Sequence, residues 1–212
     1  MVLQHARGGD FNNWLSNNYK DFNWTYKLKV LKNIINGLKE IHQKKMVHRD
    51  FHVGNILLAT TSNVGRIKNM LCISDMRLCG EADNLDKTKI YGVMPYVAPE
   101  VLRGNLYTQA ADIYSFGMVM YFVATGRQPF ANCAHDELLA LDICKGIRPK
   151  INELEAPKCY IDLMKKCWDL NPVNRLNVTE VEELIGLFYS EQFNEAENYR
   201  LNNNNGVKNV EA

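Results

Sequence analysis

The chain has 212 residues, of which 46% are hydrophobic and 23% are charged, and this balance suits one soluble domain with a substantial core. Its formal net charge is only +1, so no broad electrostatic field would draw nucleic acid or an anionic membrane surface toward it. The longest apolar stretch, residues 116–124, is too short to span a bilayer, and we therefore expect neither nucleic acid nor a membrane among the partners.

Hydrophobic periodicity predicts a mainly helical chain with one small β-hairpin. Apolar side chains recur at steps of three and four over residues 26–42, which is typical of an amphipathic helix. Two short apolar runs, residues 55–59 and 70–74, are separated by a polar turn and predict the hairpin. Residues 110–125 are apolar almost all round, which indicates a buried helix. Three amphipathic helices are expected farther along the chain, at residues 136–145, 161–170 and 178–193.

The end of the chain differs from the rest in composition. Residues 190–212 contain a run of four asparagines, Asn202 to Asn205, and few apolar side chains. Such a segment cannot bury enough surface to order itself, so we expect a flexible Asn-rich tail. Residues 1–189 are then the one folded domain.

Cysteine usage indicates a reducing compartment. No two of the six cysteines have C-x-x-C spacing, and most lie in apolar runs, so we expect buried, reduced thiols and no zinc site. No secretory signal precedes the first motifs, because Met1 leads at once into polar residues. We therefore expect a cytoplasmic protein. The sequence does not indicate an oligomeric state.

Three polar side chains carry the candidate chemistry. Asp50 ends the run His48-Arg49-Asp50, and Asn55 follows at a distance that lets one loop hold a carboxylate and a carboxamide on the same side. Asp75, at the end of the second predicted strand, adds a hard oxygen ligand of the kind that Mg²⁺ prefers. A carboxylate that orients a hydroxyl, together with an Asn and an Asp that hold Mg²⁺, is what phosphoryl transfer requires. Alone, Asp75 could equally be a turn or cap residue.

The ordered set of motifs resembles the eukaryotic protein kinases of tyrosine-kinase-like type. Residues 48–58 are similar to the catalytic loop and the strand after it, and Asp75-Met76-Arg77 stands where the metal-binding D-F-G motif belongs. Ala98-Pro99-Glu100 resembles the end of the activation segment, and residues 112–117 resemble the start of the long buried helix. The implied fold is α+β and protein-kinase-like, a mostly helical C-terminal lobe with a small β-hairpin near the catalytic loop. Glu100 and Arg175 are then an expected ion pair.

The resemblance implies transfer of a phosphoryl group from Mg-ATP to a Ser/Thr or Tyr hydroxyl of a protein substrate. Asp50 would be the catalytic base, and Asn55 and Asp75 would be the Mg²⁺ ligands. Asn55 and His52 are the other expected catalytic residues. His52 stands where Ser/Thr kinases usually have Lys, and Val93 stands where they have Thr. Both changes suit a tyrosine-kinase-like subgroup and leave the acceptor residue open.

The first residues resemble the last strand of the small lobe and the hinge that follows it. Leu3 would be the gatekeeper, and backbone groups of Gln4 and Ala6 would face the adenine of ATP. Asp10 would reach the ribose, and Leu57 would pack under the adenine ring. Taken alone, the segment would read as an ordinary strand and turn.

The chain also departs from the family pattern. Neither a glycine-rich loop nor a V-A-I-K-type lysine lies upstream, so we expect the small lobe to be missing and ATP to lie on an open floor. Met76 can fill the slot of the usual Phe. Arg77 replaces a glycine; it either restricts the turn and places a cation near Mg²⁺, or points to solvent.

Two other interpretations of the whole chain stay open, and so does one about regulation. The chain could be a non-catalytic pseudokinase or docking module, or it could come from an incomplete gene model. Thr88 and Tyr91 lie in the activation segment, where Arg49 would pair with a phosphate, or they are exposed loop residues without a regulatory role.

Overall fold

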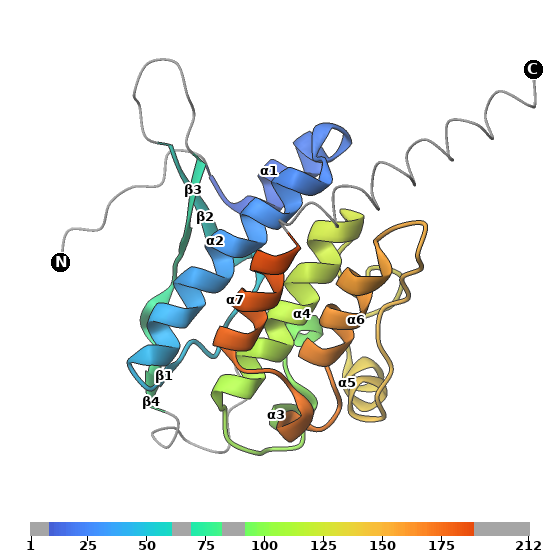
Figure 1. The fold of residues 1–212 in the computed structure, drawn as a ribbon. Coiled ribbons are helices and arrows are strands. Elements are labelled where there is room, and N and C mark those ends of the chain that lie inside the picture. Colours follow the sequence, from blue (N-terminus) through green and yellow to red (C-terminus); the bar gives the residue numbers. More distant parts are fainter. Residues whose placement is uncertain (1–8, 61–68, 82–91, 189–212) are drawn as a thin grey trace, which may run out of the picture.

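The structure, a computed structural model, describes residues 9–60, 69–81 and 92–188. In Figure 1 the long helix α2 runs between the strands β2 and β3 on one side and the remaining large helices on the other. The α+β fold expected from the sequence is confirmed. The helices are α1 (Phe11–Asn18), α2 (Trp24–Gln43), α3 (Pro99–Leu102), α4 (Gln109–Thr125), α5 (Glu137–Cys144), α6 (Lys158–Cys167) and α7 (Val178–Leu187). The strands are β1 (Met46–Val47), β2 (Ile56–Thr60), β3 (Asn69–Ile73) and β4 (Gly80–Glu81).

Helix α4 lies at the centre of the core. Every residue from Ala111 to Ala124 is buried, as expected for a helix that is apolar all round. It packs against α2 and α6, and α2 in turn packs against α7 and β3. Helix α4 ends at Thr125 and is capped by Gly126, whose φ of +70° is the left-handed conformation that glycine adopts at low cost. A Cβ atom there would also lie 2.8 Å from the ring of Tyr19.

The predicted helix over residues 26–42 is confirmed as α2, with two more residues at its start. The side chain of Asn23 accepts a hydrogen bond from the backbone N–H of Tyr26 at 3.0 Å, which caps the helix. The buried residues of α2 include Leu28, Leu31, Ile34, Ile35 and Leu38, which form the expected apolar stripe.

The predicted hairpin is confirmed as the antiparallel pair β2 and β3. Its register runs from Ile56 opposite Ile73 to Thr60 opposite Asn69. A second small ladder pairs β1 with β4, Met46 opposite Glu81 and Val47 opposite Gly80. Because β2 begins where β3 ends, the residue before β2 and the residues after β3 meet at the same end of the hairpin.

Helix α1 was not predicted. Its sequence contains four asparagines, which favour turns over helix interiors, so the periodic signal is short and weak. Tertiary packing supplies what propensity does not. Phe11 and Leu15 are fully buried, and the Phe11 ring lies 6.1 Å from that of Trp14 and 6.2 Å from that of Phe122.

The three helices expected after α4 are confirmed as α5, α6 and α7, with shifted ends. Helix α6 starts at Lys158 because Pro157 stands at its N-cap, and it ends at Cys167, three residues earlier than expected. Helix α7 opens with a capping box in which Asn177 and Glu180 bond each other's backbone N–H groups. Residues 189–193 of the predicted helix and the predicted tail of residues 190–212 lie outside the described residues.

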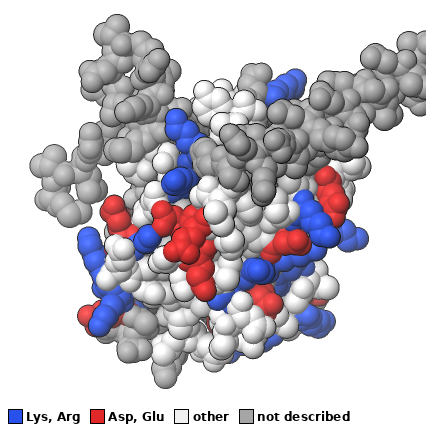
Figure 2. Space-filling view, in the orientation of Figure 1, with Lys and Arg blue, Asp and Glu red and all other residues white. Residues whose placement is uncertain are grey.

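The surface agrees with the low net charge. On the face shown in Figure 2, acidic and basic side chains lie interspersed. Among the described helices, none has the length and hydrophobicity needed to span a bilayer. All six cysteines are free, as expected, but only Cys167 is buried. The prediction of buried thiols was wrong for Cys133 and Cys159, which are exposed, and holds only in part for the half-buried Cys72, Cys79 and Cys144.

Candidate active site

The loop that carries Asp50 is fastened to α4 by one buried carboxylate. Asp112, which is 1% exposed, accepts hydrogen bonds from the backbone N–H of His48 at 2.8 Å and of Arg49 at 3.1 Å. The Nε2 atom of His42 lies 3.0 Å from the same carboxylate. These contacts hold Arg49 at a φ of +71°, a left-handed conformation that costs energy for a residue other than glycine.

The side chains of His48 and Arg49 connect this loop to the chain after β3. The backbone N–H of Asp50 donates to Nδ1 of His48 at 3.3 Å. That bond places the ring proton on Nε2, which lies 3.0 Å from the backbone carbonyl of Ser74 and donates to it. The buried guanidinium of Arg49 donates to the carbonyl of Leu78 at 3.0 Å and to that of Glu81.

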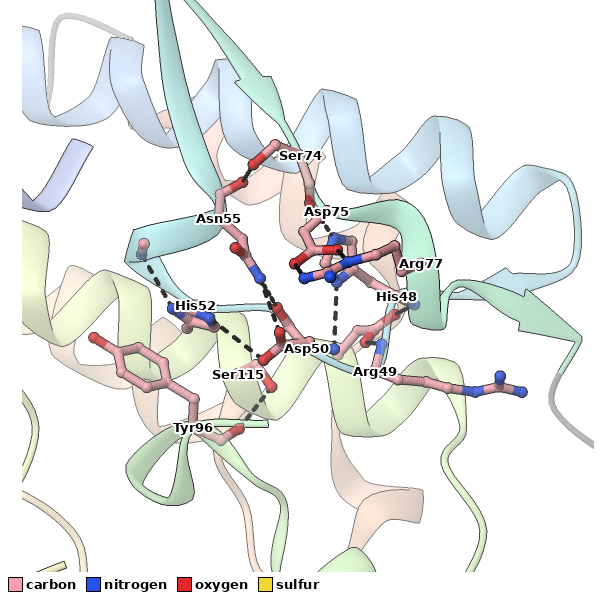
Figure 3. Close-up of polar contacts among 12 residues, drawn as sticks. His48, Arg49, Asp50, His52, Asn55, Ser74, Asp75, Arg77, Tyr96 and Ser115 are labelled. Atoms are coloured by element: carbon pink, nitrogen blue, oxygen red, sulfur yellow. Dashed lines mark hydrogen bonds and ion pairs between the residues drawn. The ribbon is translucent and has the colours of Figure 1, made fainter. Parts of the chain in front are cut away.

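Asp50 is held by Asn55 and His52 (Figure 3). The Asn55 amide nitrogen donates to the backbone carbonyl of Asp50 at 2.9 Å and to its Oδ2 atom at 3.0 Å. The Nε2 atom of His52 lies 3.4 Å from Oδ1 of Asp50. Because the backbone N–H of Gly54 donates to Nδ1 of His52, the proton is on Nε2 and faces the carboxylate.

These neighbours keep Asp50 ionised. The His52 imidazole, together with the Asn55 amide and the nearby His48, holds the pKa of Asp50 below its usual range despite partial burial. The 3.4 Å contact with His52 is too long for a good hydrogen bond. Within the described residues, Oδ1 of Asp50 therefore has no hydrogen-bond donor, and the carboxylate has unused capacity to accept one.

Asn55 and Asp75 meet because of the hairpin. The backbone N–H of Ser74 donates to the carbonyl of Asn55 at 2.8 Å, and its hydroxyl donates to the same oxygen at 2.9 Å. Both partners of the Asn55 amide nitrogen are acceptors, so the amide is fixed with its Oδ1 atom on the other side. Figure 3 shows the side chains of Asn55 and Asp75 on the same side of the loop.

A divalent cation fits this pair of ligands. Amide and carboxylate oxygens are the donors that Mg²⁺ takes, and it commonly uses only one or two carboxylates plus water and substrate phosphates. No group of three or more His, Cys, Asp or Glu side chains in the described ranges could hold a metal by itself. The donor set therefore suits a metal that arrives with a phosphate-bearing substrate.

The carboxylate of Asp75 is engaged by Arg77. The Nε and Nη2 atoms of Arg77 donate to Oδ1 and Oδ2 of Asp75, both at 2.7 Å. This hydrogen-bonded guanidinium lowers the pKa of Asp75 to about 2. The sequence left open whether Arg77 lies near the metal position or points to solvent. Its side chain is 86% exposed and also holds the carboxylate of Asp75, the proposed metal ligand.

Comparison with known proteins agrees with this geometry. The family model for "Protein tyrosine and serine/threonine kinase" matches residues 1–185. The chain belongs to the protein kinase family. It is similar to the "Putative serine/threonine-protein kinase/receptor R831" of Acanthamoeba polyphaga mimivirus, with 35% identity over 196 residues that cover 91% of this chain.

Two kinases of Dictyostelium discoideum are also similar. One is described as a probable serine/threonine-protein kinase, with 28% identity over 82% of this chain. The other is "Dual specificity protein kinase zakA", with 29% identity over 97% of this chain. The chain spans only 11% of the viral relative, 12% of the first Dictyostelium relative and 28% of the second.

The segment Ala98-Pro99-Glu100 is joined to the helical body by an ion pair, as expected. Arg175 donates from Nη1 and Nη2 to the two carboxylate oxygens of Glu100, both at 2.7 Å, and both residues are buried. The predicted ion pair is confirmed. Thr88 and Tyr91 lie outside the described residues. Met76, expected to fill an apolar slot, is 45% exposed, so that prediction was wrong for this structure.

The predicted nucleotide residues are only partly described. Asp10 and Leu57 form an isolated β-bridge, so the structure brings these two together. Asp10 also caps α1, because its carboxylate accepts hydrogen bonds from the backbone and the side chain of Asn13 at 2.8 and 2.6 Å. Leu3, Gln4 and Ala6 lie outside the described residues.

Sequence reasoning missed Asp112 as a site residue. It was seen only as the start of the buried helix, and its bonds to the loop that carries Asp50 span 63 and 64 positions. The position of Asp112 in the sequence could have indicated this role, because a charged residue in the first turn of an otherwise apolar helix needs a buried partner. The roles of His48 and Ser74, which join the loop to the end of β3, were also missed.

Proposed function

We propose that this kinase domain transfers the terminal phosphoryl group of Mg-ATP to a Ser, Thr or Tyr hydroxyl of a protein substrate. The observation that carries the proposal is the state of Asp50, a carboxylate with a lowered pKa and no hydrogen-bond donor on Oδ1 within the described residues. Its side chain is 19% exposed although Oδ1 itself is buried, so an acceptor hydroxyl would approach the exposed part of the carboxylate.

Asp50 would act as the catalytic base. An acceptor hydroxyl that donates to this carboxylate has its oxygen oriented for in-line attack on phosphorus. As the new oxygen–phosphorus bond forms and the bond to the ADP oxygen breaks, the hydroxyl proton passes to Asp50 and then to solvent. His52 would be a positioning residue, since its Nε2 atom faces Oδ1 at 3.4 Å.

Asn55 and Asp75 would hold Mg²⁺. When bound, Mg²⁺ would offset the negative charge that develops on the transferred phosphoryl group. Asn55 would contribute its Oδ1 atom, because its amide nitrogen is bound to Asp50 and no described residue donates a hydrogen bond to Oδ1. Leu57 and Asp10 would line the adenine and ribose side, with backbone groups of Gln4 and Ala6. The hydrogen bonds from the loop backbone to Asp112 would hold Asp50 and Asn55 in position before a ligand binds.

The experiment that tests this is transfer of label from γ-³²P ATP to a mixture of Ser-, Thr- and Tyr-containing peptides in the presence of Mg²⁺. Asp50→Asn should lower transfer by about 10² to 10⁴-fold, the range for loss of a general base. Asp142→Asn is the matched control because Asp142 is an exposed aspartate on α5. Equal transfer by Asp50→Asn and the control, or no transfer by the wild-type chain, would contradict the proposal.

A second candidate function is favoured by one observation. Both oxygens of Asp75 accept hydrogen bonds from Arg77, so the metal ligand is engaged. A domain in which this pair never opens would bind partners through its helical face without catalysis. The same transfer assay distinguishes the two, because a docking module transfers no label in any variant.

A further inference from the structure

The backbone conformation of residues 75–78 brings the side chains of Arg77 and Asp75 into hydrogen-bond contact. Asp75 has a φ of +57° and a ψ of +58°, the left-handed conformation, and a 3₁₀ turn over residues 76–78 follows it. This combination folds the chain back, so that the side chain two residues later lies over the carboxylate (Figure 3). Aspartate tolerates the left-handed region better than most residues. The guanidinium then meets the carboxylate in the two-bond arrangement that arginine favours.

The pair uses the same atoms that a metal needs. Each oxygen of Asp75 accepts one short hydrogen bond at 2.7 Å from Arg77. A cation bound on the Asn55 side needs at least one of these oxygens at close range, and a guanidinium and a divalent cation repel one another. Metal binding must therefore displace at least one of the two bonds.

The pair is also weak enough to open. The Arg77 side chain is 86% exposed, and the Asp75 side chain is 26% exposed. Ion pairs in such positions are surrounded by water and screened by salt, and they contribute little. Two other titratable groups, Asp50 and His48, lie near enough to interact electrostatically with the pair, and neither forms a hydrogen bond with Asp75 within the described residues.

We propose that Arg77 is a built-in competitor of the divalent cation for Asp75, which weakens metal binding until the metal and its nucleotide displace the guanidinium. The proposal rests on the proposed function, in which Asp75 is a metal ligand. It adds a chain-specific regulation of that site, since Arg77 stands where the family pattern has glycine. Because the competition is electrostatic and exposed, it must fade as salt concentration rises.

The test is a titration of the full 212-residue chain with Mn²⁺, followed by water-proton relaxation, at low and at high salt. Arg77→Gln should bind Mn²⁺ about two- to fivefold more tightly than the wild type at low salt, the size expected for removal of an exposed ion pair. At about 1 M salt, where the screening length is about 3 Å, the two affinities should converge.

Arg127→Gln is the matched control. It removes the same charge from another exposed arginine, which pairs with Glu155, and should leave Mn²⁺ affinity unchanged. Asp75→Asn should abolish the gain when combined with Arg77→Gln. Equal affinities for Arg77→Gln and Arg127→Gln would overturn the proposal, and so would the absence of Mn²⁺ binding in every variant.

Failure of this inference and failure of the proposed function are distinguishable. If Arg77→Gln binds Mn²⁺ more tightly but no variant transfers phosphate, competition at Asp75 is supported and the proposed kinase activity is wrong. If the wild type transfers phosphate and Arg77→Gln shows unchanged Mn²⁺ affinity, catalysis stands and the competition is wrong.

Discussion

The carboxylate of Asp112 holds the backbone of Arg49 in a left-handed conformation, with a hydrogen bond of 3.1 Å to the Arg49 N–H and a φ of +71° at that residue. The same carboxylate accepts from the N–H of His48. One buried side chain of α4 thus fixes the start of the loop that carries Asp50 and Asn55. The geometry of the candidate active site depends on a residue that touches none of the reacting groups.

Asp112→Asn should therefore destabilise the domain and loosen the loop. An amide in place of the carboxylate turns a donor toward at least one of the backbone N–H groups and leaves it unsatisfied in the core, which costs about 1–3 kcal/mol. The free energy of unfolding in urea measures this directly. Asp142→Asn, an exposed change of the same chemistry, should stay within about 0.5 kcal/mol. A loss in Asp112→Asn no larger than in this control would show that the anchor is not needed.

Glu100→Gln should cost much more than removing an exposed acid. The Glu100–Arg175 pair is buried, and removal of one partner leaves an uncompensated charge in the core, typically about 3–5 kcal/mol. Glu155→Gln breaks the exposed pair with Arg127 and should cost about 1 kcal/mol or less. Chemical denaturation of the two variants compares them. Similar decreases in the free energy of unfolding would contradict the view that burial determines how much an ion pair contributes to stability.

The double variant Glu100→Leu with Arg175→Met tests whether the buried site needs an ion pair or only two residues without an unpaired charge. Replacement of both charged groups by apolar ones is often neutral or stabilising, so part of the stability lost in Glu100→Gln should return. No recovery would mean that the other bonds of Arg175, to the carbonyls of Asp169 and Ala110, matter more than the ion pair.

His52→Ala should raise the pKa of Asp50. The His52 imidazole is the main cause that lowers this pKa, so its loss moves the value back toward the usual range. A carboxyl whose pKa is lowered by folding adds stability above its unfolded pKa and loses it as pH falls through the folded value. The stability that Asp50 contributes should therefore disappear at a higher pH in the variant. Titration of the Asp50 carboxyl carbon by NMR measures the shift, with Asp142 as internal reference. An unchanged Asp50 pKa would refute the role of His52.

The regular elements could be predicted because their signals are local. The apolar stripe of α2 is periodic, and the apolar run of α4 is continuous over four or more turns. Both helices were placed within two residues of their ends. The hairpin followed from two short apolar runs. Helix α1 could not be predicted because its stability comes from Phe11 and Leu15 packing into a core built by later segments.

The residues of the candidate active site could be proposed from the sequence, but the hydrogen bonds between them could not. Asp50, Asn55 and Asp75 could be named because their spacing is characteristic, and the hairpin register then brings Asn55 and Ser74 together. The hydrogen bonds between Arg77 and Asp75 depend on a left-handed backbone at Asp75, which the sequence pattern does not predict. The anchor at Asp112 depends on a contact between segments more than 60 positions apart.

The most direct test of the central claim separates binding from transfer in Asp50→Asn. In the proposed function Asp50 acts on the acceptor hydroxyl, whereas Asn55 and Asp75 hold the metal, so calorimetry should show Mg-ATP binding within about twofold of wild type. Single-turnover transfer from the bound nucleotide to a peptide hydroxyl should fall by about 10² to 10⁴-fold. Undiminished transfer in Asp50→Asn, with binding intact, would contradict the assignment of Asp50 as the base.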